Sequence, residues 1–305
     1  MYFADEASGR PFSKDPAVVK FKGRYWLYYS LPDYKGKPSK GWSIGIATSD
    51  NLLDWKKAGE LTSSGEAERN GFCAPGAVVL GDKIHLFYQT YGNARQDAIC
   101  HAWSQDGLRF TRNPTNPVFR PSGDWNCGRA IDADAIVDGD RLLLYWATRD
   151  PAFKRQMQGV AAAPLTSDFA RDKWKQLNPD GPILKPELPW EGDCIEAAAM
   201  LRHDGRLYMF YAGNYNNAPQ QVGVAVSDDG VRFTRLSDQP FLPNGPPGSW
   251  NSSESGHPFC FHDEDGKDYL FYQGNNDRGR TWYLSMTPIA WKDGKPVLAT
   301  ARKGR

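Results

Sequence analysis

The sequence predicts an all-β protein, a five-bladed β-propeller in which each blade has four antiparallel strands. Three observations support this fold class. A segment that starts with a cation and ends in aromatic residues recurs five times, and the starting cations are 59, 58, 65 and 61 residues apart. Each copy follows a Gly- or Asp-containing turn, and no long segment has the period of a helix. A four-stranded unit repeated at this spacing is typical of propeller blades. The five segments are residues 24–29, 83–88, 141–146, 206–211 and 267–272.

The first unit sets the pattern that the others repeat. Residues 17–21 and 25–30 are its first two strands, joined by a tight turn. A loop rich in Gly, Pro and Lys then leads to a third strand at 42–47, and a further turn leads to a fourth strand that carries Trp55. β-branched and aromatic residues between clusters of Gly, Asp, Asn and Pro indicate strands and turns.

The later units keep the same order. Asp-Gly between alternating apolar runs is the strongest short-range signal for a hairpin, and units two and four have it at Asp106-Gly107 and Asp229-Gly230. We therefore expect one domain over residues 1–305, because stacked repeats bury one continuous core. The expected blades are residues 12–65, 72–122, 130–185, 194–243 and 255–300. The expected strands are 77–80, 84–88 and 98–103 in unit two, 197–201, 207–212 and 222–226 in unit four, and third strands at 159–163 and 282–286 in units three and five.

Charge and composition exclude several classes of partner. A chain of 305 residues with a net charge of +1 gives no electrostatic reason to bind nucleic acid or a membrane surface. No apolar run approaches the roughly 18 residues of a membrane span. The five cysteines follow no metal-binding spacing, and their odd number argues against a disulfide scaffold, so we expect buried or idle thiols and a monomer.

Propeller geometry converts sequence position into location. The first strand of each blade is innermost, so its opening residue should stand at one mouth of the central channel. Loops on the same side should bring aromatic and arginine side chains to that mouth. Acids at the floor of a pocket and aromatic rings on its walls suit sugars, whose apolar faces stack on aromatic rings while their hydroxyls bind charged groups. The expected ring residues are Asp15, Ala74, Asp132, Glu196 and His257, and the expected surrounding residues are Trp42, Trp125, Trp190, Trp250, Arg95, Arg129, Arg149 and Arg280.

Each ring residue also has a purely structural interpretation. Asp15 precedes a proline and could belong to an ordinary turn, and His257 alone is more readily a core histidine. Asp132 and Asp134 lie in a strand that is otherwise apolar, which favours a function. Glu196 has the least polar neighbours, and an ionised carboxylate is costly to bury, so we expect Glu196 to stay protonated and to donate a proton. Occupation of matching positions by all of them favours a functional site.

Three of the units carry motifs that resemble those of glycoside hydrolase family 43, a family of five-bladed propeller enzymes acting mainly on arabinose- and xylose-containing glycans. The resemblance extends over the whole chain. Asp15 followed by Pro16 resembles the first-blade motif, whose Asp is the general base. Asp132 matches the third-blade Asp, which holds the sugar and modulates the pKa of the acid. Glu196 matches the fourth-blade general acid.

The second and fifth units resemble the same family. Residues 72–75 resemble an element in which an aromatic residue, here Phe72, walls the sugar site. His257 follows a Gly as in the fifth-blade motif, whose His lies near the channel axis and in some members helps to hold a hydrated calcium ion. Arg280 occupies the place of a sugar-binding arginine. The chain departs from the family pattern at Ala198, where many members have Pro, and at Pro258, where a small residue is usual.

The resemblance implies single-displacement hydrolysis with inversion. Asp15 would take a proton from the attacking water, and Glu196 would protonate the departing oxygen. Such carboxyl pairs stand roughly 6.5–9.5 Å apart. Asp132 would help to keep Glu196 protonated in the free enzyme. The activity that we expect first is that of an exo-α-L-arabinofuranosidase acting on plant-type polysaccharides or oligosaccharides. No cofactor is expected for the chemistry. No signal segment precedes Tyr2, so the substrate class is the sole basis for expecting a secreted or periplasmic location.

Other functions stay open at this point. β-Xylosidase and β-galactofuranosidase activities occur within the same family. A retaining fructosidase is the next alternative, because residues 149–151 (Arg-Asp-Pro) bear some likeness to a motif of related propeller enzymes. A non-catalytic sugar-binding or protein-interaction propeller is the remaining one, although an interaction propeller has no reason to place three acids on its ring.

Overall fold

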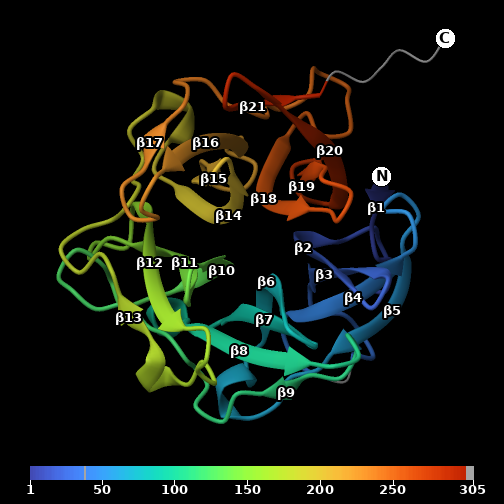
Figure 1. Ribbon diagram of the computed structural model, residues 1–305. Coiled ribbons are helices and arrows are strands. Elements are labelled where there is room, and N and C mark those ends of the chain that lie inside the picture. The colour runs from blue at the N-terminus through green and yellow to red at the C-terminus, as the bar shows by residue number, and fades with distance from the viewer. Residues whose placement is uncertain (38, 300–305) are drawn as a thin grey trace.

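The computed structural model describes residues 1–37 and 39–299. Five antiparallel sheets stand around a central channel, which confirms the predicted five-bladed propeller (Figure 1). The helical elements in the described residues are short 3₁₀ turns, and none of them has the length or apolar character needed to cross a membrane. These turns are η1 (Glu66–Glu68), η2 (Ala94–Gln96), η3 (Arg171–Lys173) and η4 (Pro189–Glu191).

The first four blades share one strand order, in which the chain starts at the channel and moves outward strand by strand. The outermost strands of blades two to four have only two residues each. Blade one contains β2 (Lys14–Phe21), β3 (Arg24–Leu31), β4 (Ser43–Ser49) and β5 (Lys56–Leu61). Blade two contains β6 (Phe72–Leu80), β7 (Lys83–Thr90), β8 (Ile99–Ser104) and β9 (Thr111–Arg112). Blade three contains β10 (Ile131–Asp138), β11 (Arg141–Arg149), β12 (Gln156–Pro164) and β13 (Lys175–Gln176). Blade four contains β14 (Ile195–His203), β15 (Arg206–Gly213), β16 (Gln221–Ser227) and β17 (Thr234–Arg235).

The fifth blade joins the two ends of the described chain. Its inner strands are β18 (Glu254–His262), β19 (Asp268–Asn275) and β20 (Tyr283–Lys292). Its outer position is shared by β1 (Tyr2–Phe3), which pairs with the first half of β20, and β21 (Lys295–Leu298), which pairs with the second half. The sequence pattern did not predict the contribution of β1. This pairing closes the ring and protects the edge of β20.

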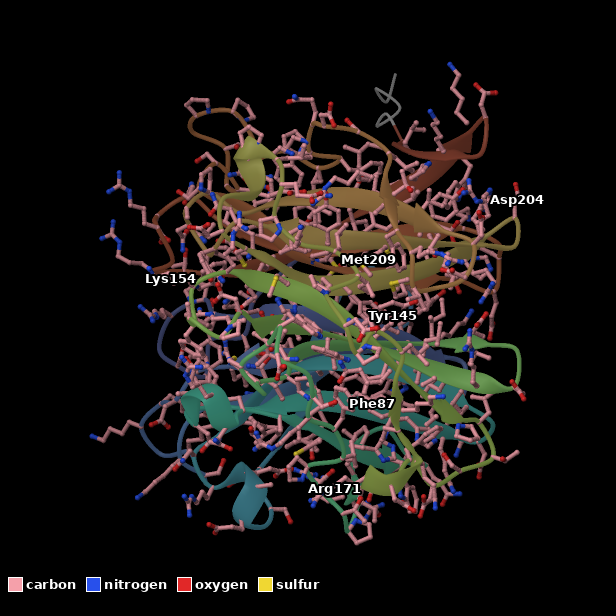
Figure 2. The ribbon with its side chains drawn as sticks, turned by 90° about the vertical axis from the view of Figure 1, so that its left-hand side faces the viewer. Phe87, Tyr145, Lys154, Arg171, Asp204 and Met209 are labelled. Carbon is pink, nitrogen blue, oxygen red and sulfur yellow. The ribbon has the colours of Figure 1, made fainter. Side chains whose placement is uncertain are left out.

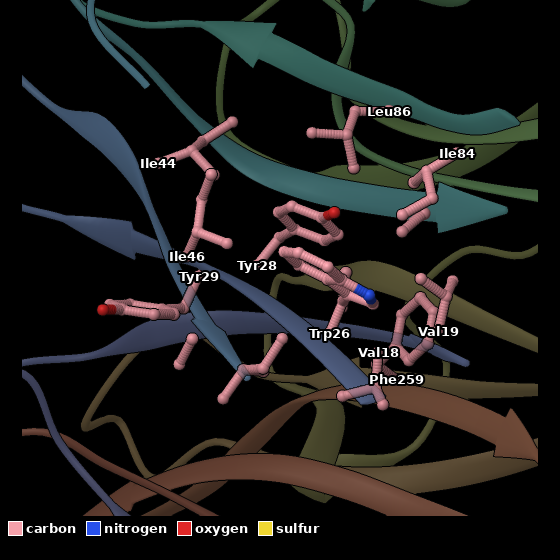
Figure 3. Close-up of a cluster of buried hydrophobic side chains, with 14 of the residues drawn as sticks. Val18, Val19, Trp26, Tyr28, Tyr29, Ile44, Ile46, Ile84, Leu86 and Phe259 are labelled. Atoms are coloured by element: carbon pink, nitrogen blue, oxygen red, sulfur yellow. The ribbon is translucent and has the colours of Figure 1, made fainter. Parts of the chain in front are cut away.

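The core lies between neighbouring blades. Both faces of each inner and middle strand are covered, so these strands are buried almost continuously instead of in alternation. Figure 3 shows the layer between the first two blades, where side chains of β3 and β4 meet those of β7. Buried tyrosines add hydrogen bonds to the next blade's hairpin, Tyr28 Oη donating to Gly107 O at 3.0 Å and Tyr145 Oη to Gly230 O at 2.9 Å. Labelled residues of this layer in Figure 3 include Trp26, Tyr28, Ile44, Ile46, Ile84 and Leu86.

Buried ion pairs fix the loops that lead from one blade to the next. In η4, Glu191 is completely buried and binds Arg235 of β17 through two contacts, Nε to Oε1 at 2.8 Å and Nη2 to Oε2 at 2.9 Å. Tyr211 Oη donates to the same carboxylate at 2.8 Å. Blade two repeats the arrangement with Glu68 of η1 and Arg112 of β9. Although burial alone would raise the pKa of Glu191, the hydrogen bonds from Arg235, from two backbone N–H groups and from Tyr211 lower it.

The propeller has two distinct ends. Figure 2 shows Lys154, in the loop between β11 and β12, and Asp204, in the turn between β14 and β15, at opposite ends of the molecule. The inner strands begin at the Lys154 end, because Ile131 at the start of β10 pairs with Ala147 near the end of β11. All five cysteines are free thiols, as expected.

Candidate active site

A pocket opens where the inner strands begin. Its volume is about 180 Å³, and it contains all three carboxylates that the sequence singled out. Most of its lining comes from the first few residues of all five inner strands, with two consecutive residues from each of the first three blades and one from each of the last two. The lining residues are Lys14, Asp15, Trp42, Cys73, Ala74, Gln89, Tyr91, Ile131, Asp132, Glu196, Asn216 and His257.

A β-bulge in every inner strand turns the backbone at this point. The pairing with the second strand skips residues just after the strand begins, and one residue in each bulge has a left-handed backbone conformation. Such conformations cost roughly 1–3 kcal/mol in residues other than glycine and cluster at functional sites. Bulges next to active sites re-aim side chains. The residues and their φ angles are Asp15 (52°), Ala74 (48°), Asp132 (51°), Ala197 (51°) and His257 (42°).

Glu196 does not occupy the same position as the other ring residues, which corrects the sequence expectation. Ala197 has the left-handed conformation in blade four, and Glu196 is the residue before it, paired with Ala212. The hairpins of blades one to four all leave two residues between the paired strand ends, so the bulge lies nine residues before the cation in each of these blades. Counting ten residues back from Arg206 therefore reached the neighbouring position, which also faces the pocket.

Asp15 is set up to be ionised. Burial acts to raise its pKa, but the neighbouring His257 and Lys14 and a hydrogen bond from Ser30 outweigh it, and the pKa is lowered. His257 Nδ1 lies 3.2 Å and Lys14 Nζ 3.9 Å from Asp15 Oδ1. Burial lowers the pKa of His257 more than Asp15 raises it, so the imidazole is neutral at neutral pH. Lys14 is then the lasting cation beside this carboxylate.

Asp132 shows the opposite tendency in the same pocket. Burial is the largest cause, and the nearby carboxylates of Glu196 and Asp15 add to it, so the pKa of Asp132 is raised well above its ordinary value. The Asp132 backbone N–H donates to Gln89 Oε1 at 2.9 Å, which fixes the bulge to the preceding blade. Asp132 therefore retains a proton under conditions in which Asp15 has lost its own.

Two buried glutamines that sequence reasoning missed hold the carboxyl group of Glu196. Gln156, at the start of β12, donates its side-chain amide to Glu196 Oε2, and Gln220, just before β16, donates to Oε1 at 2.7 Å. Both side chains are almost fully buried. One sequence feature could have revealed these glutamines. Only units three and four have a glutamine at the start of the third strand.

Apart from the ring residues, one predicted aromatic residue and six unpredicted residues line the pocket. Trp42 lines the pocket as expected, and Tyr91, Asn216 and Lys14 line it as well. Lys14 Nζ donates to Asn216 Oδ1 at 2.8 Å and lies 6.0 Å from the ring centre of Trp42. Burial alone would lower the pKa of Lys14, but the surrounding carboxylates raise it, so a cation faces the acids across the pocket.

Four aromatic residues predicted to wall the pocket pack elsewhere. Phe72 is completely buried against Tyr88, with ring centroids 5.4 Å apart. Trp125, Trp190 and Trp250 lie on the sheets, each stacked or tilted against a buried aromatic ring of its blade. Glycines make room for two of these rings, because a Cβ would meet Trp190 at Gly213 and Gly223, and Trp250 at Gly274. These tryptophans were assigned to the mouth from loop position, which does not fix where a ring packs.

The predicted arginines Arg95, Arg129, Arg149 and Arg280 are not among the residues that line the pocket. Arg129 Nη1 is 3.5 Å from Gln156 Oε1, and Arg149 Nε donates to the same oxygen at 3.2 Å, so both act on the group that holds Glu196. Arg280 is exposed, and its Nε donates to Asp277 O at 3.4 Å.

The calcium expectation at His257 remains a prediction. His257 Nδ1 is directed at Asp15, and within residues 1–37 and 39–299 no three His, Cys, Asp or Glu side chains gather in a metal-binding arrangement.

Asp134 has a structural role distinct from that of Asp132. Its carboxyl group accepts the backbone N–H of Met200 at 2.7 Å and of Ala135 at 2.9 Å, which ties blade three to blade four. Burial raises its pKa to about 7. Asp134 lines a second cavity, of about 370 Å³, formed by the later parts of the inner strands.

This raised pKa predicts a loss of stability as the pH rises. Because the folded state keeps the Asp134 proton up to about pH 7 while the unfolded chain loses it near 3.8, the free energy of unfolding should fall over that interval. Between pH 5 and pH 8 the contribution is about 3 kcal/mol, from two pKa units. In Asp134→Asn this part of the decrease should vanish, as measured by urea unfolding at both pH values. An unchanged decrease in the variant would contradict the assignment.

Comparisons with known proteins bear on the family and the fold of this chain. A 1,2-β-oligomannan phosphorylase of Thermoanaerobacter sp. (strain X514) is 26% identical over 224 residues, which cover 70% of this chain and 67% of that protein. A β-xylosidase of Xylanibacter ruminicola is 31% identical over 121 residues, 39% of this chain and 33% of the xylosidase. The crystal structure of a thermostable family-43 glycoside hydrolase superposes with a TM-score of 0.75 at 21% identity, over 99% of this chain and 97% of that one. The sequence model of Glycosyl hydrolases family 43 matches residues 9–296. The chain therefore belongs to glycosyl hydrolases family 43 and is a glycoside hydrolase.

Proposed function

We propose that this glycoside hydrolase inverts the anomeric configuration and releases terminal pentose-type sugars, with α-L-arabinofuranosyl units as the preferred substrate. One observation carries the proposal. Asp15 and Asp132 share one pocket with Glu196, and their surroundings move their pKa values in opposite directions. Such a separation supports Asp15 as the ionised base and leaves a proton within the Asp132–Glu196 pair, from which Glu196 would donate it.

In the proposed mechanism, Asp15 is the general base. It is ionised at neutral pH and takes a proton from the water that attacks the anomeric carbon. Glu196 donates a proton to the departing glycosidic oxygen. Asp132 keeps a proton within the Asp132–Glu196 pair in the free enzyme, because two buried carboxylates in one site repel each other when both are ionised. Lys14 offsets part of the negative charge and is available to sugar hydroxyls.

The size of the pocket supports release of one terminal unit. At about 180 Å³ it is smaller than the roughly 300–1,000 Å³ of drug-sized ligand sites, so it suits a single sugar ring instead of a stretch of polymer. Trp42 and Tyr91 offer aromatic faces for that ring. The β-xylosidase relative supports a pentose, and β-xylosyl and β-galactofuranosyl units are the next candidates. We also propose that the protein is a monomer and that it acts outside the cytoplasm on plant-type glycans.

The placement of Asp150 speaks against the fructosidase alternative. Its carboxylate accepts the backbone N–H groups of Lys154 at 2.7 Å and Arg155 at 3.2 Å, so it shapes its own loop. Asp150 is not among the residues that line the pocket.

A substrate panel with product analysis tests the proposal. We expect release of arabinose from 4-nitrophenyl α-L-arabinofuranoside and from arabinan, with inverted configuration by proton NMR. Retention would favour the fructosidase-type mechanism, and sugar binding without release of reducing ends would indicate a binding protein. A parallel reaction with inorganic phosphate asks whether phosphorolysis competes, since one relative is a phosphorylase.

A further inference from the structure

The carboxyl group of Glu196 is held at both oxygens by side chains whose orientation is fixed. Gln156 donates to Oε2 and Gln220 donates to Oε1 at 2.7 Å. The opposite end of each glutamine accepts from a group that can only donate. Gln156 Oε1 accepts Arg149 Nε at 3.2 Å, and Gln220 Oε1 accepts the backbone N–H of His257 at 3.1 Å. The amide nitrogens must therefore be the atoms that face Glu196.

The repeat shows that these glutamines are a local departure from the pattern of the other blades. In blades one, two and five, the second-strand residue opposite the start of the bulge has a polar side chain that accepts the bulge N–H of the next blade. In blades three and four the corresponding residue is alanine. The space is taken by Gln156 and Gln220, which hold equivalent positions, each two residues before the strand partner of that alanine. The polar residues are Ser30, Gln89 and Gln273, and the alanines are Ala147 and Ala212.

The arrangement directs the Glu196 proton. Each carboxyl oxygen has two lone pairs, and one on each oxygen of Glu196 accepts an amide N–H. A proton on this carboxyl group must then occupy the remaining side of an oxygen, away from the glutamines. Glu196 lines the pocket, whereas Gln156 and Gln220 are buried and do not. The glutamines therefore act on the reaction through the residues that they hold, which is Glu196 for both and also the His257 backbone for Gln220.

We propose that Gln156 and Gln220 are positioning residues for the general acid, a role that rests on the proposed function of Glu196. They hold both oxygens so that the acidic O–H faces the glycosidic oxygen of the substrate. They contribute to the protonation of the leaving group and not to the binding of the sugar.

The experiment compares two leaving groups in Gln156→Met, which removes the donor and keeps the side-chain length. With α-1,5-arabinobiose, whose leaving group needs a proton, kcat should fall about 10- to 100-fold with KM little changed, because the lost hydrogen bond is made to a carboxyl group that becomes charged as its proton leaves. With 4-nitrophenyl α-L-arabinofuranoside, which needs little protonation, kcat should change less than about threefold. Gln220→Met should behave in the same way. β-1,4-Xylobiose and 4-nitrophenyl β-xyloside replace this pair if the panel selects xylose.

Gln158→Met is the matched control. Gln158 lies in the same strand, is completely buried, and its side-chain amide has no hydrogen-bond partner among the described residues. Its replacement should leave both reactions unchanged. Gln156→Asn, which keeps a shorter polar side chain, repeats the measurement if the methionine variant does not fold.

The variant Glu196→Gln distinguishes a failure of the positioning role from a failure of the proposed function. If Glu196→Gln loses arabinobiose cleavage selectively and Gln156→Met does not, the positioning role is overturned and the proposed function stands. Equal losses on both substrates in Gln156→Met, or a large rise in KM, would also overturn it. If Glu196→Gln cleaves arabinobiose at the wild-type rate, the acid assignment itself fails.

Discussion

Asp15→Asn is expected to lower kcat by about 10²- to 10⁴-fold on every substrate, because the attacking water loses its general base whatever the leaving group is. The amide has nearly the shape of the carboxylate but cannot accept a proton in this step. Asparagine also tolerates the left-handed backbone at this position, where φ is 52°. The measurement is kcat and KM on 4-nitrophenyl α-L-arabinofuranoside and arabinobiose, with circular dichroism to establish that the fold is intact.

The pattern across substrates distinguishes the base from the acid. Asp15→Asn should affect both substrates equally, whereas Glu196→Gln should affect mainly arabinobiose. Turnover close to that of the wild type in Asp15→Asn would remove the basis of the inverting mechanism.

Arg235→Met is expected to lower the free energy of unfolding by about 3–5 kcal/mol, since it leaves a buried carboxylate without its cation. Glu191 is completely buried and forms two contacts of 2.8 and 2.9 Å with this guanidinium. Tyr211 and two backbone N–H groups would remain as donors to the carboxylate. The measurement is urea unfolding monitored by tryptophan fluorescence.

An exposed ion pair in the same blade provides the control. Arg232 and Asp229 are 2.7 Å apart, but the Arg232 side chain is 89% exposed. Arg232→Met should change the free energy of unfolding by no more than about 1 kcal/mol. Equal effects in the two variants would show that burial does not set the value of the Glu191 pair.

The repeat made the fold predictable. Five cation-to-aromatic strands at nearly constant spacing predicted five blades, and the structure confirms them. The same period placed Asp15, Asp132 and His257 at equivalent bulges around one mouth, and brought Glu196 to the same pocket. Position along a regular repeat is a local property of the chain, so counting residues was enough to locate these groups.

The predicted aromatic residues of the pocket show that position within the repeat does not determine where a side chain packs. Trp42 reaches the pocket, whereas Trp190 and Trp250 cover glycines within their own blades. Trp42 directly precedes the third strand of its blade, whereas Trp190 and Trp250 lie in the connections between blades, and the sequence alone did not show that this difference matters. Which way a ring packs depends on space that a glycine in another strand leaves open.

The sequence by itself determined the blade count, the strand order and the mouth at which the acids lie, because these follow from a spacing that recurs along the chain. Only the tertiary structure decided that Glu196 precedes its bulge, that β1 closes the fifth blade, and that Gln156 and Gln220 hold the acid. Each of these depends on contacts between strands far apart in the chain. Such contacts are set by register and by the volume of neighbouring side chains, which no local pattern records.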